Sequence, residues 1–209
     1  MQESVKELGK DKRFAQLIAK YGEPNLKRGG NPFQALVRSV ISQQLSTKAA
    51  ATIRNRFLTL YTKPKKGKGK VTPRFPTPAE VLATTVPQMR AVGLSNQKAT
   101  YLHDLALKFS DGTIKHRSLS KMKSEEIVEH LVQVKGIGVW SVQMFLIFTL
   151  NRLDVLPTGD LGVRKGMQKL YKLRDLPTPQ KMEILAKPWR HHASVASWYL
   201  WRVADEYKR

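Results

Sequence analysis

The feature that most constrains this chain is a tight turn between two helical patterns in its second half. Gly136, Ile137 and Gly138 separate an amphipathic segment from a strongly apolar one, and a lone carboxylate, Asp160, follows. Glycine takes positive φ without steric cost, so two glycines around one apolar residue indicate a short hairpin. The N–H groups that open the next helix can then meet an anion, whose charge the helix dipole favours. The stretch predicts two helices joined by an anion-binding turn.

The rest of the chain also has helical periodicity, and alternating strand patterns are nearly absent. Ser46 and Ser124 stand where helix N-caps are expected. The apolar stripes predict helices around residues 14–21, 32–41, 46–60, 79–83, 86–92, 96–109, 124–135, 139–150, 161–171, 179–187 and 192–208. The predicted fold class is all-α.

Composition restricts the classes of protein that remain. With 209 residues and 41% hydrophobic content, the chain is long and apolar enough for one globular domain or two small ones. The absence of cysteine excludes disulfides, thiolate zinc sites and iron–sulfur clusters. No apolar run has membrane-spanning length, and the first residues lack the apolar core of a secretion signal. We therefore expect a cytoplasmic or nucleoid location, or a nuclear one in a eukaryote.

The charge is strongly positive and unevenly distributed. Lys and Arg total 37 against 16 Asp and Glu, a formal net charge of +21. No acidic residue occurs from Pro24 to Ala79, a stretch with many lysines and arginines. Within it, the segment Lys63–Pro78 is rich in lysine, glycine and proline, which predicts a basic loop without a core of its own. Such a field attracts polyanions, and nucleic acid is favoured over anionic lipid because no basic amphipathic helix with a broad aromatic face is present.

Several blocks together resemble one protein family. They are NPFQALVRSVISQQLSTKAAATIRNRF, FPTPAEVLATTVPQMRAVGLSNQKATYLHDLA, VKGIGVWSVQMFLI, LPTGDLGVRKG and PWRHHASVASWYLWR. In this order they are similar to the 3-methyladenine DNA glycosylase II family of the helix-hairpin-helix DNA glycosylase superfamily. The resemblance covers nearly all of the chain from Asn31 to Arg202 and is more specific than any single glycine motif.

The resemblance implies a fold and a reaction. The fold would be a two-lobed helix-hairpin-helix core with the active site in the cleft between the lobes. One helical domain would span residues 31–150, and residues 1–30 and 151–209 would form the other. The reaction would be hydrolysis of the N-glycosidic bond of alkylated purines in duplex DNA, which initiates base excision repair. No organic or redox cofactor is implied, and we expect a monomer.

Asp160 stands where this family keeps its catalytic aspartate. From the local sequence alone, the plainer interpretation is an N-cap for the helix that begins at Leu161, and both roles are compatible. Cleavage of an N-glycosidic bond builds positive charge on the sugar, which a carboxylate stabilises. A base alkylated at a ring nitrogen is already cationic and leaves readily, so a second acid is not required.

Trp140 separates the mechanistic subclasses. In bifunctional relatives such as endonuclease III, a catalytic lysine occupies the second position after the last glycine of the hairpin. Here that position holds Trp140. Tryptophan cannot form a Schiff base, so the implied enzyme is monofunctional and uses water as its nucleophile. Packing in the core is the alternative interpretation for this side chain.

The resemblance also places residues around the flipped base. Trp140 and Trp198 would be aromatic walls that attract an electron-poor base by about 1–2 kcal/mol each. Gln43 would face the base, and Met144 stands where some relatives have tyrosine, which widens the uncertainty about the substrate. Either Gln44 or Leu45 would be the wedge that fills the gap left in the duplex. A polar helix end with Leu45 packed inward is an equally good interpretation of this segment.

The remaining residues concern the DNA backbone. Lys135, Gly136, Ile137 and Gly138 would bind it through the hairpin, and Arg164 and Lys165 would either bind phosphates or form a solvated face. By resemblance, carbonyls of Val134 and Ile137 would hold a monovalent cation that bridges to a phosphate. We assign no role to His191 and His192, since adjacent histidines do not share a helical face.

Two alternative functions stay open at this point. A non-catalytic protein that recognises damaged or unusual DNA would use the same hairpin, but it would need neither Asp160 nor the two tryptophans. A bifunctional glycosylase-lyase is disfavoured by Trp140. The sequence does not decide which alkylated or deaminated base is preferred.

Overall fold

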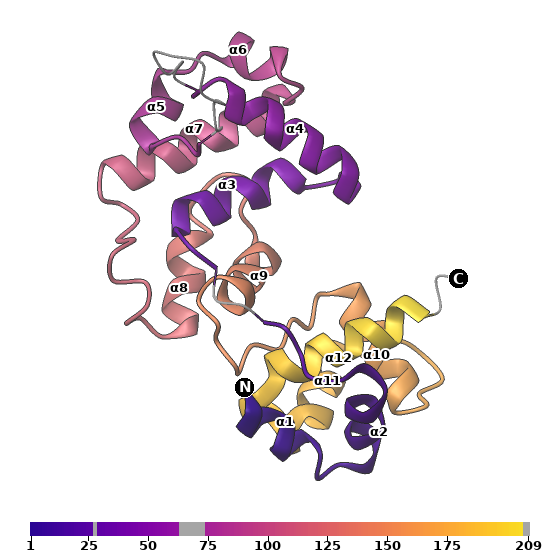
Figure 1. The fold of residues 1–209 in the computed structure, drawn as a ribbon. Coiled ribbons are helices and arrows are strands. Elements are labelled where there is room, and N and C mark those ends of the chain that lie inside the picture. The colour runs from indigo at the N-terminus through magenta and orange to yellow at the C-terminus, as the bar shows by residue number, and fades with distance from the viewer. Residues whose placement is uncertain (27–28, 63–73, 207–209) are drawn as a thin grey trace. The chain divides into compact units, whose positions relative to one another are not determined.

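The computed structural model describes residues 1–26, 29–62 and 74–206. In these residues every regular element is a helix and no strand occurs, which confirms the all-α prediction (Figure 1). The predicted basic loop Lys63–Pro78 lies outside the described residues up to position 73. No helix of the described part of the chain combines the length and apolar character needed to cross a bilayer.

The chain divides into two compact units. The first unit consists of Met1–Gly29 and Gln143–Arg209, and the second of Gly30–Val142. The first contains α1 (Gln2–Leu8), α2 (Lys12–Tyr21), α10 (Leu161–Leu170), α11 (Pro179–Ala186), the 3₁₀ helix η1 (Lys187–His192) and α12 (Ala193–Asp205). The second contains α3 (Pro32–Ser42), α4 (Thr47–Thr59), α5 (Pro78–Ala83), α6 (Val86–Ala91), α7 (Asn96–Ser110) and α8 (Ser124–Leu131). The boundary falls inside α9 (Val139–Phe148), whereas the sequence suggested one after residue 150.

Helix starts in this chain are set mainly by side-chain caps. Ser46 accepts the N–H of Ala49 and caps α4, as predicted. The prediction that Ser124 caps α8 was wrong, since the N-cap residue is Lys123. The carboxylate of Glu126 accepts the N–H of Lys123 at 3.0 Å, so the first turn closes one residue earlier.

The core of the second unit surrounds α7. Its buried residues include Ala99, Leu102, Leu105 and Phe109, and helices α3, α5 and α6 pack against it. The rings of Phe33 on α3 and Phe109 on α7 lie 5.2 Å apart. α7 therefore has one face in the core, and its remaining positions are available to support neighbouring loops.

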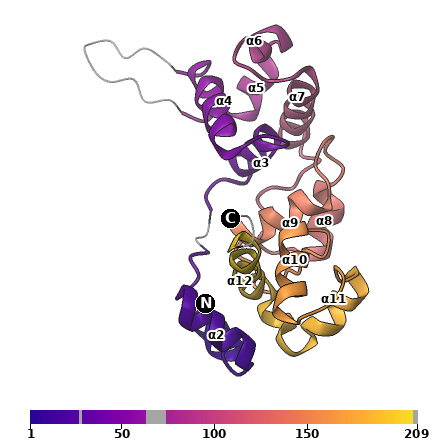
Figure 2. The same ribbon diagram turned by 90° about the vertical axis from the view of Figure 1, so that its right-hand side faces the viewer.

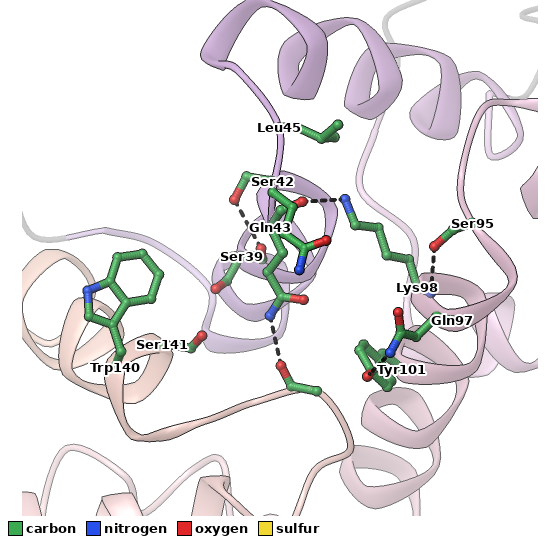
Figure 3. Close-up of a pocket in the computed structure, with 12 residues that line it drawn as sticks. Ser39, Ser42, Gln43, Leu45, Ser95, Gln97, Lys98, Tyr101, Trp140 and Ser141 are labelled. Carbon is green, nitrogen blue, oxygen red and sulfur yellow. Dashed lines mark hydrogen bonds between the residues drawn. The ribbon is translucent and has the colours of Figure 1, made fainter. Parts of the chain in front are cut away.

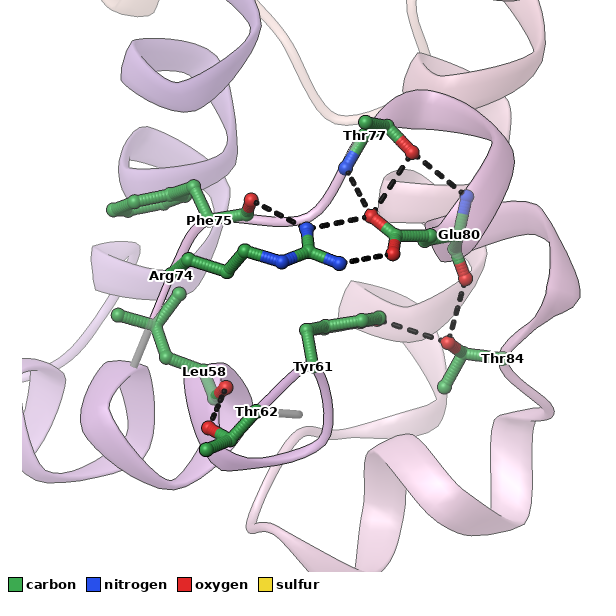
Figure 4. Close-up of polar contacts among 8 residues, drawn as sticks. All are labelled: Leu58, Tyr61, Thr62, Arg74, Phe75, Thr77, Glu80 and Thr84. Atoms are coloured by element: carbon green, nitrogen blue, oxygen red, sulfur yellow. Dashed lines mark hydrogen bonds and ion pairs between the residues drawn. The ribbon is translucent and has the colours of Figure 1, made fainter. Parts of the chain in front are cut away.

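A polar network fixes the start of α5 (Figure 4). Glu80 accepts the N–H of Thr77 at 2.9 Å and forms two hydrogen bonds with the guanidinium of Arg74. The Arg74 guanidinium and the N–H of Thr77 lower the pKa of the Glu80 carboxyl to about 2. Both side chains are partly exposed, so the ion pair adds little stability, and its main effect is to hold residues 74–77 against the first turn of α5.

In the first unit, α12 packs along α10 (Figures 1 and 2). The contact is close because α10 carries Gly166: a Cβ built there would lie 2.1 Å from the carbonyl oxygen of Leu200 on α12. On the other side of α12, the ring of Tyr199 meets Phe14 of α2 at 6.5 Å, and its hydroxyl donates to the carbonyl of Gly22. These contacts hold the start of α10 and the last turns of α12 in fixed register.

Candidate functional site

The predicted hairpin joins α8 to the first residues of α9, and all of these residues belong to the second unit. Gly136 has φ of 79°, and a Cβ there would lie 2.0 Å from the ring of Tyr101. Ile137 is buried and donates its N–H to the carbonyl of Val134 at 3.0 Å. Gly138 is exposed, and its carbonyl accepts the N–H of Val142, so the α9 hydrogen-bond ladder begins here. The turn needs glycine at position 136 both for its φ and for the close approach of an aromatic ring.

The hairpin is also braced from α7. Asp104 accepts the backbone N–H of Lys135 at 2.8 Å and pairs with the ammonium of Lys108 at 2.6 Å. Burial alone would raise the pKa of the Asp104 carboxyl, but Lys108 and the Lys135 N–H hold that pKa below its ordinary value. The carboxylate thus fixes the hairpin backbone, while the side chain of Lys135 stays exposed.

The end of α3 lies beside the hairpin in the same unit. Gln43 donates from its side-chain amide to the carbonyl of Gly136 at 2.7 Å (Figure 3). Gln44 is exposed and has φ of 57°, which is unusual for a residue other than glycine, and Leu45 is half-buried. These are the residues predicted to face the base and to form the wedge, and the structure brings all three to one loop.

A pocket of about 620 Å³ lies between this loop and the hairpin. Most of its side chains are polar and uncharged, and Trp140 closes one side of it with 47% of the residue exposed. Its lining residues are Ser39, Ser42, Gln43, Gln44, Leu45, Ser95, Gln97, Lys98, Tyr101, Gly136, Trp140 and Ser141. The exposure of Trp140 argues against a role in core packing and leaves its ring accessible.

Asp160 occupies the N-cap of α10 in the first unit. Its Oδ1 accepts the N–H of Val163 at 2.8 Å and the indole N–H of Trp201 at 2.8 Å. The cap confirms the plainer interpretation of this residue, and the second hydrogen bond adds to it. Two donors on one oxygen fix the plane of the carboxylate, which is the arrangement that a charge-stabilising group needs.

Trp201 is the partner that the sequence did not indicate. Its ring stacks on Phe148 at 5.7 Å with an interplanar angle of 25°. A Cβ at position 162 would lie 2.8 Å from Trp201 Cδ1 and 3.1 Å from Asp160 Oδ1, so Gly162 makes room for the contact. This glycine, two residues after Asp160, is the one local signal that a bulky side chain approaches here.

Trp198 lies one helical turn before Trp201 on α12 and has different surroundings. Trp198 lies in a second pocket of about 670 Å³ in the first unit, and the guanidinium of Arg202 stands 4.7 Å from its ring centroid. The pocket is otherwise lined by Lys20, Tyr21, Glu23, Asp205 and Glu206. Met144 is half-buried on α9. The assignment of Trp198 and Met144 to the base pocket stays a prediction.

The basic residues after Asp160 differ from each other. Arg164 donates from Nε to the carbonyl of Pro177 at 3.1 Å, so part of its guanidinium supports a loop, whereas Lys165 is exposed. His192 contacts the hydroxyl of Ser4 at 3.1 Å, which gives it a place in the packing of α1. Among the residues described, no three His, Asp or Glu side chains are grouped so as to hold a metal ion.

Comparison with known proteins agrees with this geometry. The family model for HhH-GPD superfamily base excision DNA repair proteins matches residues 37–191. DNA-3-methyladenine glycosylase 1 of Schizosaccharomyces pombe is 36% identical over 197 residues, which cover 92% of this chain and 81% of that protein.

Two solved structures are similar over nearly the whole chain. The structure of S. pombe 3-methyladenine DNA glycosylase in complex with abasic DNA has a TM-score of 0.80 and 34% identity, and covers 97% of this chain and 96% of its own. A DNA-3-methyladenine glycosidase from Bacillus halodurans has a TM-score of 0.83 and 32% identity, with coverage of 98% and 90%. The chain, with its glycine hairpin and capped aspartate, therefore belongs to the HhH-GPD superfamily of base excision DNA repair proteins.

Proposed function

We propose that this protein is a monofunctional DNA glycosylase that removes alkylated purines of the 3-methyladenine type from duplex DNA. The observation that carries the proposal is the Asp160 carboxylate, held by Val163 and Trp201 at the start of α10. The S. pombe and Bacillus relatives, which bear the name of this activity, support it. The abasic DNA in the structure of the S. pombe relative supports duplex DNA as the partner.

The reaction follows from the charge on each group. A purine methylated at a ring nitrogen is cationic, so the C1′–N bond breaks with its electron pair going to the base, which leaves neutral. The sugar then carries oxocarbenium character, and the ionised Asp160 stabilises it. Water adds its oxygen to C1′ and releases a proton, which gives an abasic site and the free base. No residue needs to donate or accept a proton before the bond breaks, because the base is already cationic.

The DNA-binding part of the proposal uses the second unit. The hairpin at Gly136–Gly138 and the first N–H groups of α9 would bind a backbone phosphate, and Gln44 or Leu45 would enter the duplex when the base is flipped. A monovalent cation on the carbonyls of Val134 and Ile137 belongs to the proposal too. The Val134 carbonyl accepts one hydrogen bond and keeps a second lone pair, which suits such a ligand. A protein that acts on DNA would work in the nucleoid or nucleus.

The monofunctional assignment rests on Trp140. Borohydride traps the Schiff base that a lysine nucleophile forms with the sugar, so the wild-type protein should give no trapped enzyme–DNA adduct on a cleavable substrate. Endonuclease III, on its own substrate, serves as the positive control for trapping. A strong adduct that disappears when one particular lysine is replaced would contradict the assignment.

The substrate is tested by the bases that are released. Duplex DNA methylated with dimethyl sulfate is incubated with the protein, and free bases are resolved by chromatography. We expect 3-methyladenine to be released at the highest rate relative to the spontaneous reaction. Tight binding to the methylated DNA without release of any base would instead favour the non-catalytic DNA-binding protein.

A further inference from the structure

The loop that bears Gln44 begins at the exposed end of a helix, where backbone carbonyls lack partners within the helix. The last carbonyls of an α-helix must be satisfied from outside it, and they carry the negative end of the helix dipole. In α3, the Leu45 N–H satisfies the carbonyl of Ser42. Gln43, which directly follows Ser42, leaves the helical conformation with ψ of 132°.

Lys98 on α7 satisfies two further carbonyls at this helix end. Its ammonium donates to the carbonyl of Ile41 at 2.8 Å and to that of Gln43 at 2.7 Å (Figure 3). The two acceptors stand on either side of Ser42, so one cation joins the last turn of α3 to the first residue of the loop. Lys98 is half-buried, and this partial loss of hydration lowers the pKa of its ammonium.

The conformation of Gln44 needs such support. A residue other than glycine at φ of 57° costs free energy, and it persists only where surrounding contacts impose it. Gln43 is fixed at both ends, because Lys98 binds its carbonyl and its side-chain amide binds the carbonyl of Gly136. The backbone of the next residue therefore starts from a fixed position, which limits the directions that its side chain can take.

The same face of α7 reaches the hairpin. Tyr101, one turn after Lys98, lies against Gly136, and Asp104, one turn further, holds the N–H of Lys135. The wedge loop, defined as Gln43–Leu45, and the hairpin are thus supported by one row of side chains. A rigid support of this kind would keep the wedge loop in register with the phosphate that the hairpin is proposed to bind.

We propose that Lys98 is a positioning residue for base flipping, which caps α3 and sets the direction of the wedge loop without touching the flipped base. The inference rests on the proposed function, because the wedge matters only if a nucleotide leaves the duplex. Loss of Lys98 should then impair extrusion of the base and leave bond cleavage at Asp160 intact.

The test compares substrates that differ only in how hard the base is to extrude. An oligonucleotide with a single adenine is methylated and annealed opposite thymine or opposite a mismatched cytosine, and release of 3-methyladenine is followed at saturating enzyme. A mismatched base costs less to extrude. Lys98→Met should slow release from the paired substrate by about 10- to 100-fold, the effect of removing hydrogen bonds from a charged group. Release from the mismatched substrate should fall much less.

The ratio of the two rates cancels differences in the active fraction of each preparation. The matched control is Lys48→Met, which removes the same charge from an exposed position in the first turn of α4. It should leave both saturating rates unchanged. Equal slowing of both substrates by Lys98→Met would overturn the inference, because a purely structural role predicts a common factor. No slowing would also overturn it.

Binding gives a second measurement that does not depend on catalysis. The wild-type protein should prefer duplex DNA with a tetrahydrofuran abasic analogue, where the wedge enters most easily. Lys98→Met should lose most of this preference, whereas Lys48→Met should weaken both affinities alike. An unchanged preference for the abasic analogue would overturn the inference, whether or not the wild type releases a base. Failure of the wild type to release any base would count against the proposed function instead. Should Lys98→Met not fold, Lys98→Gln keeps a shorter, neutral donor group, and the same changes are expected at smaller size.

Discussion

At the scale of single residues, the site depends on how Asp160 is held. One oxygen of its carboxylate serves both the cap of α10 and the indole of Trp201. The cap by itself would be unremarkable, because aspartate is common at this position. A tryptophan donor at the same oxygen is not needed to start a helix, and it restricts the carboxylate to one orientation. The pair is therefore better explained by chemistry than by stability.

Asp160→Asn separates the charge from the geometry. The amide oxygen can still accept from Val163 and Trp201, so the fold and the cap should survive. Loss of the negative charge should raise the barrier by about 3–4 kcal/mol, which is on the order of a hundredfold to a thousandfold in single-turnover base release. DNA affinity should stay the same or rise. Near-normal base release by the variant would remove Asp160 from the mechanism.

Trp201→Phe removes the indole donor and keeps an aromatic ring next to Phe148. The loss of a hydrogen bond to a charged group should slow single-turnover base release by about 10- to 100-fold, with little change in DNA affinity. Trp198→Phe on the same helix is the informative comparison. A larger effect at Trp198 than at Trp201 would show that the former, as the family resemblance implies, is the more important pocket wall.

These two tryptophans show where sequence reasoning ends. The position of Asp160 before an amphipathic helix was sufficient to predict its cap, because capping is a local property. The contact with Trp201 joins residues 41 positions apart, and nothing in an apolar helix marks which tryptophan faces the carboxylate. The packing of α12 on α10 determines which tryptophan contacts Asp160, and local periodicity does not predict how two helices pack.

At the scale of helices, most elements were predictable because their apolar stripes and caps are clear. Ser124 was wrongly predicted as the cap because the Glu126 carboxylate accepts the N–H of Lys123, which makes Lys123 the N-cap residue. The kink at Trp189, with φ of −128°, lies inside η1 and has no sequence signal beyond Pro188. α9 is apolar on all its faces, so its sequence did not indicate that the boundary between the units falls within it.

Gly166→Ala tests whether helix packing positions the carboxylate. The added Cβ would meet the backbone of Leu200 and must push α10 away from α12. We expect unfolding free energy to fall by about 1–3 kcal/mol or more, measured by denaturant titration, and base release to fall as the Asp160–Trp201 contact is disturbed. Gly159→Ala is the control, since a Cβ there meets nothing within 4 Å. Its stability should change by less than about 0.5 kcal/mol. Equal stabilities would mean that the α10–α12 interface yields easily.

At the scale of the whole molecule, charge decides how the protein finds DNA. The net charge of +21 exceeds what a few specific phosphate contacts need. The acid-free stretch from Pro24 to Ala79 includes both α3 and α4, so the wedge loop lies between two segments that carry only positive charge. Such a field speeds encounter with DNA and holds it without regard to sequence.

The lysines at positions 65, 66, 68 and 70 provide a direct test of this general attraction, since only glycines separate them and no apolar residue lies among them. Replacing all four by serine should weaken binding to undamaged and damaged DNA alike. The slope of log affinity against log salt should become shallower by about 0.9 for each DNA phosphate that the variant no longer neutralises. Single-turnover base release at saturating enzyme should hardly change, because the proposed chemistry lies at Asp160. An unchanged salt slope would mean that these lysines rarely pair with phosphates, and a collapse of the saturating rate would mean that they act on the flipped nucleotide itself.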